Sequence, residues 1–195
     1  MLNIAPEISR EHFTPVHVVK EMCSHLEPGI SNTEKKIFEP SCGEGVFLVE
    51  VVERRMKKYA RRLHSKNKIL RTIALVDLVK NIYAFDVVPE FVEVTKARLL
   101  KKVSSNLTKK NFSTAEIENI ENFLMFIISS NVVCFDFLSA DSHEEILLNE
   151  WNWKTQTKLN YVSYTLSDIF CSKDINHISI PKSIGHYDIQ KVLNG

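Results

Sequence analysis

Three short apolar segments, each with an acidic residue at or near its end, constrain the fold of this chain most strongly. They are residues 35–38 (KKIF), which Glu39 follows directly, 81–88 (NIYAFDVV) and 132–137 (VVCFDF). The stretches between them carry apolar residues at helical spacing, and we expect helices over residues 46–63, 69–80, 90–102 and 117–128. Alternation of strands and helices predicts an α/β fold, with a doubly wound, mostly parallel sheet and helices on both faces.

Composition supports one globular domain. The chain has 195 residues, of which 44% are hydrophobic and 25% charged, as in ordinary globular proteins rather than disordered ones. We expect an N-terminal arm and helix over residues 1–30, a ligand-binding core over 31–140, and an irregular extension over 141–195. Within that extension the patterns are weak. Residues 161–164, 178–180 and 186–193 are candidates for short strands, the last as a fourth strand of the sheet.

Several classes of protein are disfavoured by simple patterns. The first residues lack the apolar core of a signal peptide, and no apolar run reaches the ~18 residues that a membrane span needs. The four cysteines include no Cys-x-x-Cys pair, which argues against a zinc site or a disulfide scaffold. We therefore expect a cytoplasmic protein with no membrane partner.

A basic run contrasts with the balanced charge of the chain. The formal net charge is +1, yet residues 54–71 contain nine Lys and Arg and no acid. The run would suit contacts with nucleic-acid phosphates. The alternative, which the pattern favours at this stage, is a solvated helix face followed by a basic loop.

A turn with two glycines follows the first apolar segment. Gly43 and Gly45 would let the backbone approach a ligand closely, and the amides at the start of the next helix favour anionic groups. Glu39, just before the turn, suits a cationic amino group better than a pyrophosphate. The pattern also lacks the third glycine of a dinucleotide site. A tight turn with no ligand remains the alternative.

Acids end the second and third apolar segments. Asp86 could accept hydrogen bonds from ribose hydroxyls, and Asp136 could accept from an exocyclic amine, with Phe137 beside the base. Each could instead be a helix cap or a surface residue. Ligands of parallel α/β sheets lie beyond the carboxyl ends of the strands, where these residues fall in order. The arrangement suits an amino acid, a ribose and a base, which are the three parts of S-adenosyl-L-methionine.

Four segments in order resemble the motifs of adenine-N6 DNA methyltransferases of restriction–modification systems. FEPSCGEGVFL at 38–48 resembles their Asp-Pro-Ala/Ser-Cys-Gly-Ser-Gly-x-Phe-Leu motif, and HFTPVHVVKEM at 12–22 resembles their Phe-x-Thr-Pro motif. Residues 81–100 resemble the second strand and helix of the family, and VVCFDFL at 132–138 resembles the third strand. The resemblance implies a Rossmann-like methyltransferase fold.

The resemblance also implies a role for particular residues. Phe13, Thr14 and Pro15 would cover the methionine part of S-adenosyl-L-methionine. Its methionine end would be lined by residues of the turn, namely Glu39, Ser41, Gly43 and Gly45. Asp86 would hold the ribose, and Asp136 and Phe137 would hold the adenine ring. The implied partner is duplex DNA with its target base flipped out, and the implied reaction is methyl transfer to the exocyclic amine of adenine.

The chain departs from the family at three points. Glu44 stands where the family has a small residue, and Ala84 stands where it has glycine. The sequence also has no Asn/Asp-Pro-Pro-Tyr/Phe motif, which in the family holds the target amine and stacks on the base, so no catalytic residue is assigned. The expected function is therefore the cofactor-binding part of an adenine-specific DNA methyltransferase.

Two alternatives stay open. The chain could be a catalytically inactive or truncated cofactor- or DNA-binding fragment or subunit, with the catalytic motif and target recognition on a second polypeptide or a missing C-terminal segment. It could also be a methyltransferase for RNA or for protein glutamine, although the combination of Phe-Thr-Pro with Pro-Ser-Cys-Gly favours the DNA enzymes.

Overall fold

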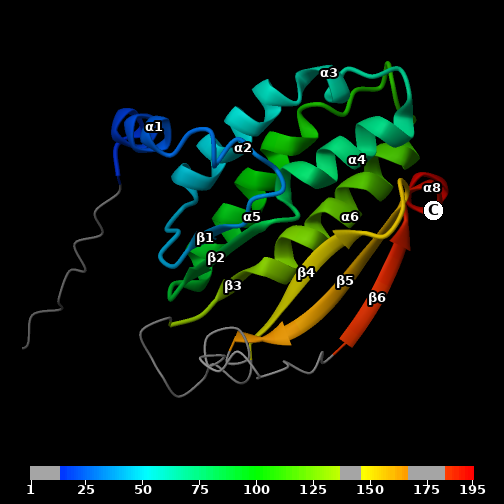
Figure 1. The fold of residues 1–195 in the computed structure, drawn as a ribbon. Helices are drawn as coiled ribbons and strands as arrows, with labels where there is room; N and C mark the ends of the chain where they lie inside the picture. Colours follow the sequence, from blue (N-terminus) through cyan, green and yellow to red (C-terminus); the bar gives the residue numbers. More distant parts are fainter. Residues whose placement is uncertain (1–13, 137–145, 167–182) are drawn as a thin grey trace, which may run out of the picture.

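The computed structural model describes residues 14–136, 146–166 and 183–195, in which helices pack against two small β-sheets (Figure 1). The helices are α1 (Val16–His25), α2 (Val46–Lys58), α3 (Ala60–Leu63), α4 (Lys68–Val79), α5 (Pro89–Ser104), α6 (Thr114–Asn131) and α8 (Ile189–Asn194). The strands are β1 (Ile37–Glu39), β2 (Ile82–Asp86), β3 (Val132–Cys134), β4 (Leu147–Trp153), β5 (Lys158–Thr165) and β6 (Ser183–Asp188).

The first sheet is parallel and joins the three segments that the sequence singles out. Its strand order is β1-β2-β3, with Ile37 opposite Ile82 and Ala84 opposite Val132. All five residues of β2 are buried, as the central strand of a covered parallel sheet requires. The predicted α/β class with parallel strands is therefore confirmed.

The two faces of the parallel sheet are covered differently. Side chains of one face, such as Ile82 and Ala84, belong to the main core that the helices build. On the opposite face Phe85 packs in a smaller cluster with Leu148 and Leu166, which come from the second half of the chain. The described part of the chain therefore does not confirm a doubly wound sheet with helices on both faces. A continuous apolar run indicates that a strand is buried on both faces, but it does not show what covers each face.

The second sheet is antiparallel and occupies residues that we expected to be irregular. Its order is β4-β5-β6. The expectation of an irregular 141–195 is therefore wrong for the described residues 147–165 and 183–194, whereas the candidate strand at 161–164 does lie within β5. Residues 186–193 form a strand only as far as Asp188. Its side chain accepts a hydrogen bond from the N–H of Gln190 at 3.0 Å and starts α8 there.

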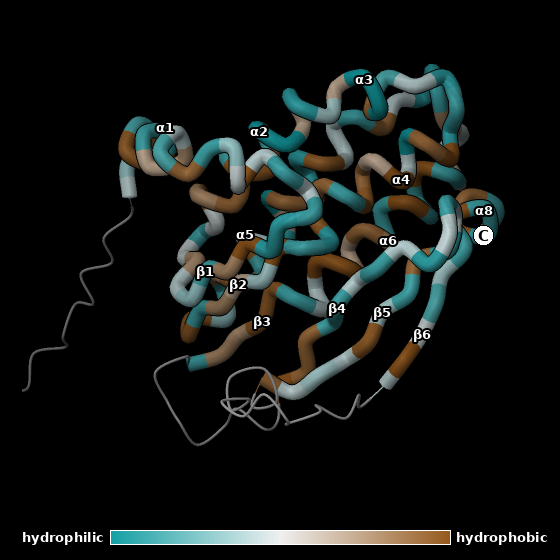
Figure 2. The backbone as a smooth tube through the Cα atoms, viewed as in Figure 1, coloured by the Kyte–Doolittle hydropathy of each residue, from teal (hydrophilic) through white to brown (hydrophobic). Residues whose placement is uncertain are grey.

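The long helices lie close to their predicted positions. Helix α4 is apolar nearly all round, and nine of its residues, 71–79, are buried, which places it inside the helix layer (Figure 2). Helix α6 begins with a capping box between Ser113 and Glu116. Among the helices of the described segments, none is both long and apolar enough to cross a membrane.

An asparagine joins the two sheets. Asn131, the last residue of α6, donates from Nδ2 to the carbonyl of Asn149 at 2.9 Å and accepts from the N–H of Asn149 at 2.8 Å. The hydroxyl of Tyr83 donates to the same carbonyl at 3.1 Å. The edge of β4 thereby meets polar partners next to β2 and β3 instead of standing open.

A buried arginine holds the segment before β1 against the helices. Arg55 of α2 is fully buried and donates to the carbonyls of Ile30 (3.1 Å), Leu78 (2.8 Å) and Lys35 (2.9 Å). Burial lowers the pKa of Arg55 to about 10, so its guanidinium stays charged at neutral pH. One residue of the basic run is thus a structural element and not a surface charge.

Replacement of Arg55 tests this role. Arg55→Met removes the donors of several buried carbonyls, and we expect a loss of about 3 kcal/mol or more in the free energy of unfolding. Urea unfolding followed by circular dichroism measures it. The matched control is Arg61→Met at an exposed position of α3, which should change stability by less than about 0.5 kcal/mol. Equal effects of the two changes would contradict the assignment.

Candidate functional site at the carboxyl ends of the parallel strands

Backbone hydrogen bonds fix the glycine turn between β1 and α2 onto the end of β2. The N–H of Cys42 donates to the carbonyl of Phe85 at 2.8 Å. The N–H of Gly43 donates to Oδ2 of Asp86, also at 2.8 Å. Gly45 then stands at the N-cap of α2, and its N–H donates to the carbonyl of Cys42 at 2.8 Å. The turn and the end of β2 therefore form one unit.

The two glycines of the turn differ in what surrounds them. Both have positive φ, 51° at Gly43 and 74° at Gly45. A Cβ on Gly45 would lie 2.7 Å from Oγ1 of Thr95, whereas a Cβ on Gly43 would have no atom within 4 Å. Gly45 thus allows close packing of the turn on α5, and Gly43 leaves open space beside the turn.

Asp86 is a buried carboxylate held by the backbone. It is 7% exposed, and besides the bond from Gly43 its Oδ1 accepts from the N–H of Val88 at 3.0 Å. An ionised carboxylate has about four acceptor positions, so these two bonds leave capacity for hydroxyl donors. Asp86 therefore fixes the turn and could also receive a ligand.

Glu39 ends β1 beside the turn and is partly buried. Burial raises the pKa of its carboxyl above the ordinary value, and a bond from the N–H of Ser41 at 3.4 Å opposes that shift. Desolvation disfavours the charged form of a carboxyl group, and a cation brought to it would favour that form again. Glu39 is thus suited to a cationic ligand group.

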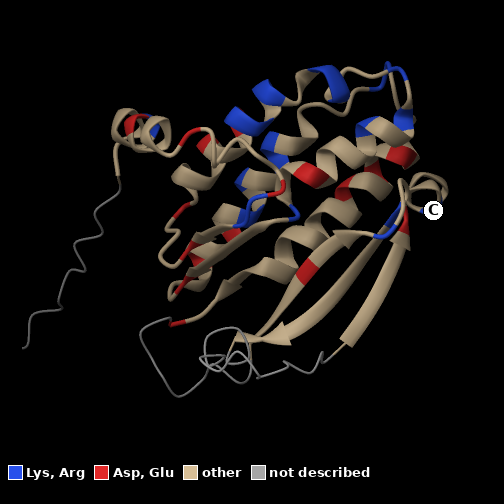
Figure 3. Ribbon diagram, in the orientation of Figure 1, with Lys and Arg blue, Asp and Glu red and all other residues tan. Residues whose placement is uncertain are grey.

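Acidic residues surround this end of the sheet. Figure 3 shows Asp and Glu at the ends of the parallel strands and in the adjoining turns. Glu44, between the glycines, forms an ion pair with Arg98 of α5, and the same guanidinium donates to the carbonyl of Glu44 at 2.9 Å. The ion pair explains how an acid is accommodated at this position of the turn, where the family that the sequence resembles has a small residue. The strand ends as a whole favour a cation over an anion.

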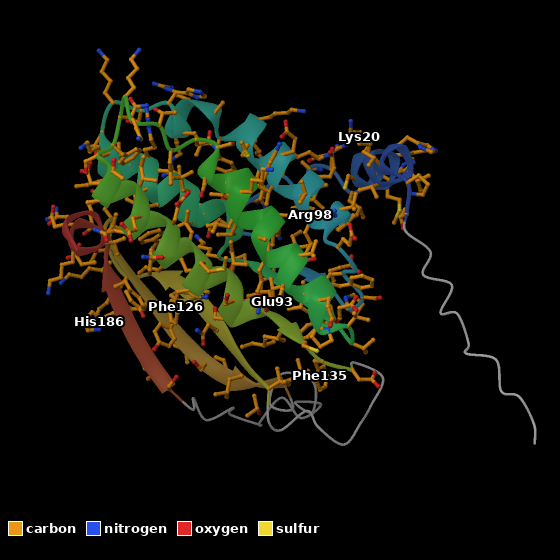
Figure 4. All side chains as sticks on the ribbon, turned by 180° about the vertical axis from the view of Figure 1, so that it is seen from behind. Lys20, Glu93, Arg98, Phe126, Phe135 and His186 are labelled. Carbon is orange, nitrogen blue, oxygen red and sulfur yellow. The ribbon has the colours of Figure 1, made fainter. Side chains whose placement is uncertain are left out.

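Aromatic rings from all three strand segments lie at the same end. The ring centroids of Phe38 and Phe85 are 5.3 Å apart, and those of Phe85 and Phe135 are 6.1 Å apart. Figure 4 labels Phe135 just after β3. The sequence analysis did not assign these rings to the site. Because successive strand residues point to opposite faces, their positions along the strands could have shown that they share one face of the sheet. Phe85 and Phe135 are buried, whereas Phe38 is exposed and could pack against a flat ligand.

The structure brings the predicted site residues together only in part. Glu39, Ser41, the two glycines and Asp86 belong to the unit of turn and strand end. Asp136 is exposed and follows β3, whose last residue, Cys134, lies opposite Asp86. Phe137, predicted to lie beside the base, is outside the described residues.

The predicted N-terminal part of the site is less well placed. Thr14 and Pro15 are exposed at the start of α1, which packs against α2 (Figure 1). Pro15 occupies the N-cap of α1, and no side chain caps the helix there. Among the described residues, no hydrogen bond joins Thr14 or Pro15 to the glycine turn. Phe13 is outside the described residues.

Helix α5 supports the turn in a way that the sequence reasoning missed. Oγ1 of Thr95 donates to the carbonyl of Gly43 at 2.8 Å. Thr95 lies on the helix face of Val92, Leu99 and Val103, all of which are buried. The sequence did contain a signal, because a threonine among apolar residues at helical spacing needs a hydrogen-bond partner for its buried hydroxyl.

Cys42 is a thiol in the turn but not a nucleophile. It is buried, and burial raises its pKa to about 11, so the thiolate is scarce at neutral pH. In the described part of the chain, no three His, Cys, Asp or Glu side chains gather as metal ligands. The buried, protonated thiol of Cys42 is therefore suited to packing within the turn.

We compared the chain with protein families, curated proteins and solved structures. No family model, no curated protein and no solved structure matches the chain.

The contrast between the two glycines gives a stability test. Gly43→Ala adds only the cost of a left-handed backbone, about 1–2 kcal/mol. Gly45→Ala adds that cost and an overlap with Thr95, so we expect a total loss of about 3 kcal/mol or more. Chemical unfolding of both variants measures the difference. Equal losses would show that α5 does not pack against the turn as described.

Proposed function

We propose that this chain binds S-adenosyl-L-methionine at the carboxyl ends of β1, β2 and β3, as the cofactor-binding part of an adenine-specific DNA methyltransferase. The observation that carries the proposal is the unit formed by the glycine turn and Asp86, next to the carboxyl of Glu39. It combines free space at Gly43, a helix N-terminus and carboxylates at adjacent strand ends.

The charges of the cofactor fit this end of the sheet. S-adenosyl-L-methionine has a cationic sulfonium and a cationic ammonium group, and Glu39 and Asp86 provide opposite charge. Its carboxylate would lie near the N–H groups that begin α2, where the helix dipole favours an anion. The ribose hydroxyls would donate to the free acceptor positions of Asp86, and the adenine ring would lie near the exposed Asp136.

The chemistry divides between the cofactor and the protein. The bound cofactor supplies a methyl group on a positively charged sulfur, which an amine can attack directly. The residues of this chain would bind and orient the cofactor and exclude water from it. The sequence has no Asn/Asp-Pro-Pro-Tyr/Phe motif to hold the adenine amine. We therefore propose that residues other than these 195 supply that motif when the methyl group is transferred.

Calorimetric titration of the chain with the cofactor tests the proposal. We expect micromolar affinity, on the order of −8 kcal/mol, for S-adenosyl-L-methionine and for its demethylated product. Asp86→Asn and Asp136→Asn should each weaken binding about tenfold or more, because each loses a charged acceptor. Both changes keep the side-chain shape.

The matched control is Glu118→Gln at an exposed position of α6, which should leave the affinity unchanged. ATP, which shares the adenosine part but carries phosphates, should bind much more weakly at the acidic strand ends. Absence of binding at millimolar cofactor by a folded chain would contradict the proposal, as would equal affinity for ATP.

The raised pKa of Glu39 predicts a pH dependence of cofactor binding. A cationic ligand favours the ionised carboxyl, so affinity should rise as the pH rises through the pKa of Glu39 and then level off. Below that pKa the affinity should fall by up to about tenfold per pH unit, because one proton is displaced. Titrations at several pH values measure the profile. Glu39→Gln should flatten it and Glu118→Gln should not; an unchanged profile in Glu39→Gln would exclude Glu39 from the site.

A further inference from the structure

Two stretches of the sequence are basic and contain no acid. Residues 54–76 contain nine Lys and Arg, and residues 94–115 contain six, without a single Asp or Glu in either. They form the end of α2 with α3 and α4, and most of α5 with the loop before α6. Helices α2 and α5 pack together, so the two stretches meet in the fold.

Some of these cations serve the structure itself. Arg55 is buried against backbone carbonyls, Arg54 pairs with Glu50 at 2.8 Å, and Arg71 donates to the carbonyl of Ser65 at 2.8 Å. Lys102 pairs with Glu53, and Lys68 pairs with Glu116 at 2.7 Å. Lys96 and Arg98 also pair with acids, Glu93 and Glu44. These residues do not count toward a binding surface.

The remaining cations gather at one end of the molecule, which we name the basic end. Its members are exposed and come from both stretches: Lys57, Lys58, Arg61, Arg62, Lys66, Lys101, Lys109 and Lys110. Figure 3 shows Lys and Arg concentrated over the end of α2, α3, the start of α4 and the loop before α6. Within the described segments, Lys57 pairs with Glu53 and Arg62 with Asp77, and the other six members have no ion-pair partner.

An aromatic anchor holds the loop before α6 in place. Phe112 is 2% exposed, and its ring centre lies 5.9 Å from Nζ of Lys68 and 5.7 Å from the guanidinium carbon of Arg71. The N–H of Phe112 and the N–H of Asn111 both donate to the carbonyl of Thr108. Lys109 and Lys110 thus project from a fixed turn beside α4, and the charges of the basic end are preorganised.

The basic end lies far from the proposed cofactor site. Helix α2 begins at the glycine turn and ends at Lys58, and its 13 residues span roughly 20 Å. The chain therefore separates charge along α2, with acids at the strand ends and cations at the opposite end (Figure 3). A polyanion would be repelled at the first and attracted at the second.

We propose that the basic end binds the phosphate backbone of a double-stranded nucleic acid. Arg61, Lys66, Lys109 and Lys110 are four of the cations without ion pairs, and they can neutralise phosphates. Their position on a helix, a loop and a fixed turn suits regularly spaced charges. An anionic membrane is disfavoured because surface-bound helices insert large apolar residues. Of the exposed large hydrophobic residues in the described chain, only Leu70 falls in the basic stretches.

Nucleic-acid binding at the basic end and cofactor binding at the strand ends use separate residues, so each can fail without the other. The probe is a fluorescent DNA duplex of arbitrary sequence, about two helical turns long, titrated with the full chain and followed by anisotropy. For four phosphate contacts, affinity should fall roughly a hundredfold between about 50 and 200 mM salt.

The variant Arg61→Gln/Lys66→Gln/Lys109→Gln/Lys110→Gln should lose at least about tenfold in affinity and most of the salt dependence. The control Lys35→Gln/Lys154→Gln/Lys158→Gln/Lys191→Gln removes the same charge from exposed lysines elsewhere and should lose much less. Equal losses in the two variants would overturn the proposal, because they would show that only net charge matters. Absence of duplex binding at low salt would overturn it too.

Vesicles with a third of anionic lipid separate the two kinds of polyanion. Binding to vesicles at least as tight as to the duplex, lost in the basic-end variant, would also overturn the proposal in favour of a membrane surface. Calorimetric binding of S-adenosyl-L-methionine should be the same in the basic-end variant as in the parent chain, which keeps this result distinct from that of the cofactor site.

Discussion

The hydrogen bond from the N–H of Gly43 to the carboxylate of Asp86 is the contact on which the rest of the site depends. It joins the turn after β1 to the end of β2, and therefore fixes where α2 begins. Thr95 supports the same turn from α5 through the carbonyl of Gly43. One buried carboxylate thus holds together the ends of two strands and, through the turn, the two helices that pack there. Its position at the strand ends also makes it available to a ligand.

Charge is distributed along the molecule in a way that the net value of +1 conceals. Carboxylates lie at the ends of the parallel strands, and unpaired cations lie about the length of α2 away. A small cationic ligand and a polyanion would therefore be drawn to different places on the same chain. The buried Arg55 shows why a basic run must be sorted residue by residue before it is assigned to a surface.

Much of the parallel half of the fold could be predicted from the sequence. The alternation of apolar segments and helical stretches predicted β1, β2 and β3 and the helices between them, because period and length are local properties. The position of Asp86 at a strand end followed from the same pattern. The antiparallel sheet could not be recognised, because its strands mix polar and apolar residues on both faces. Asn149 and Ser163, for example, are buried polar residues that bond each other.

The limits of prediction at the site have similar physical causes. Contacts such as Thr95 with Gly43, and Glu44 with Arg98, join residues more than fifty positions apart, and spacing along the chain does not reveal them. Phe38, Phe85 and Phe135 could be recognised in the sequence as apolar strand residues. That their rings lie together at one end of the sheet depends on strand register, which the sequence does not reveal. Local chemistry could thus be predicted, whereas its long-range support could not.

Hydrogen–deuterium exchange with and without S-adenosyl-L-methionine tests the central claim most directly, because it reports where the cofactor acts. If the cofactor binds at the strand ends, exchange should slow in the glycine turn at residues 40–46 and at residues 86–88, and stay unchanged in β5 and in α8. Slowed exchange confined to other segments, or no change at saturating cofactor, would contradict the claim that the ends of the parallel strands form a cofactor site.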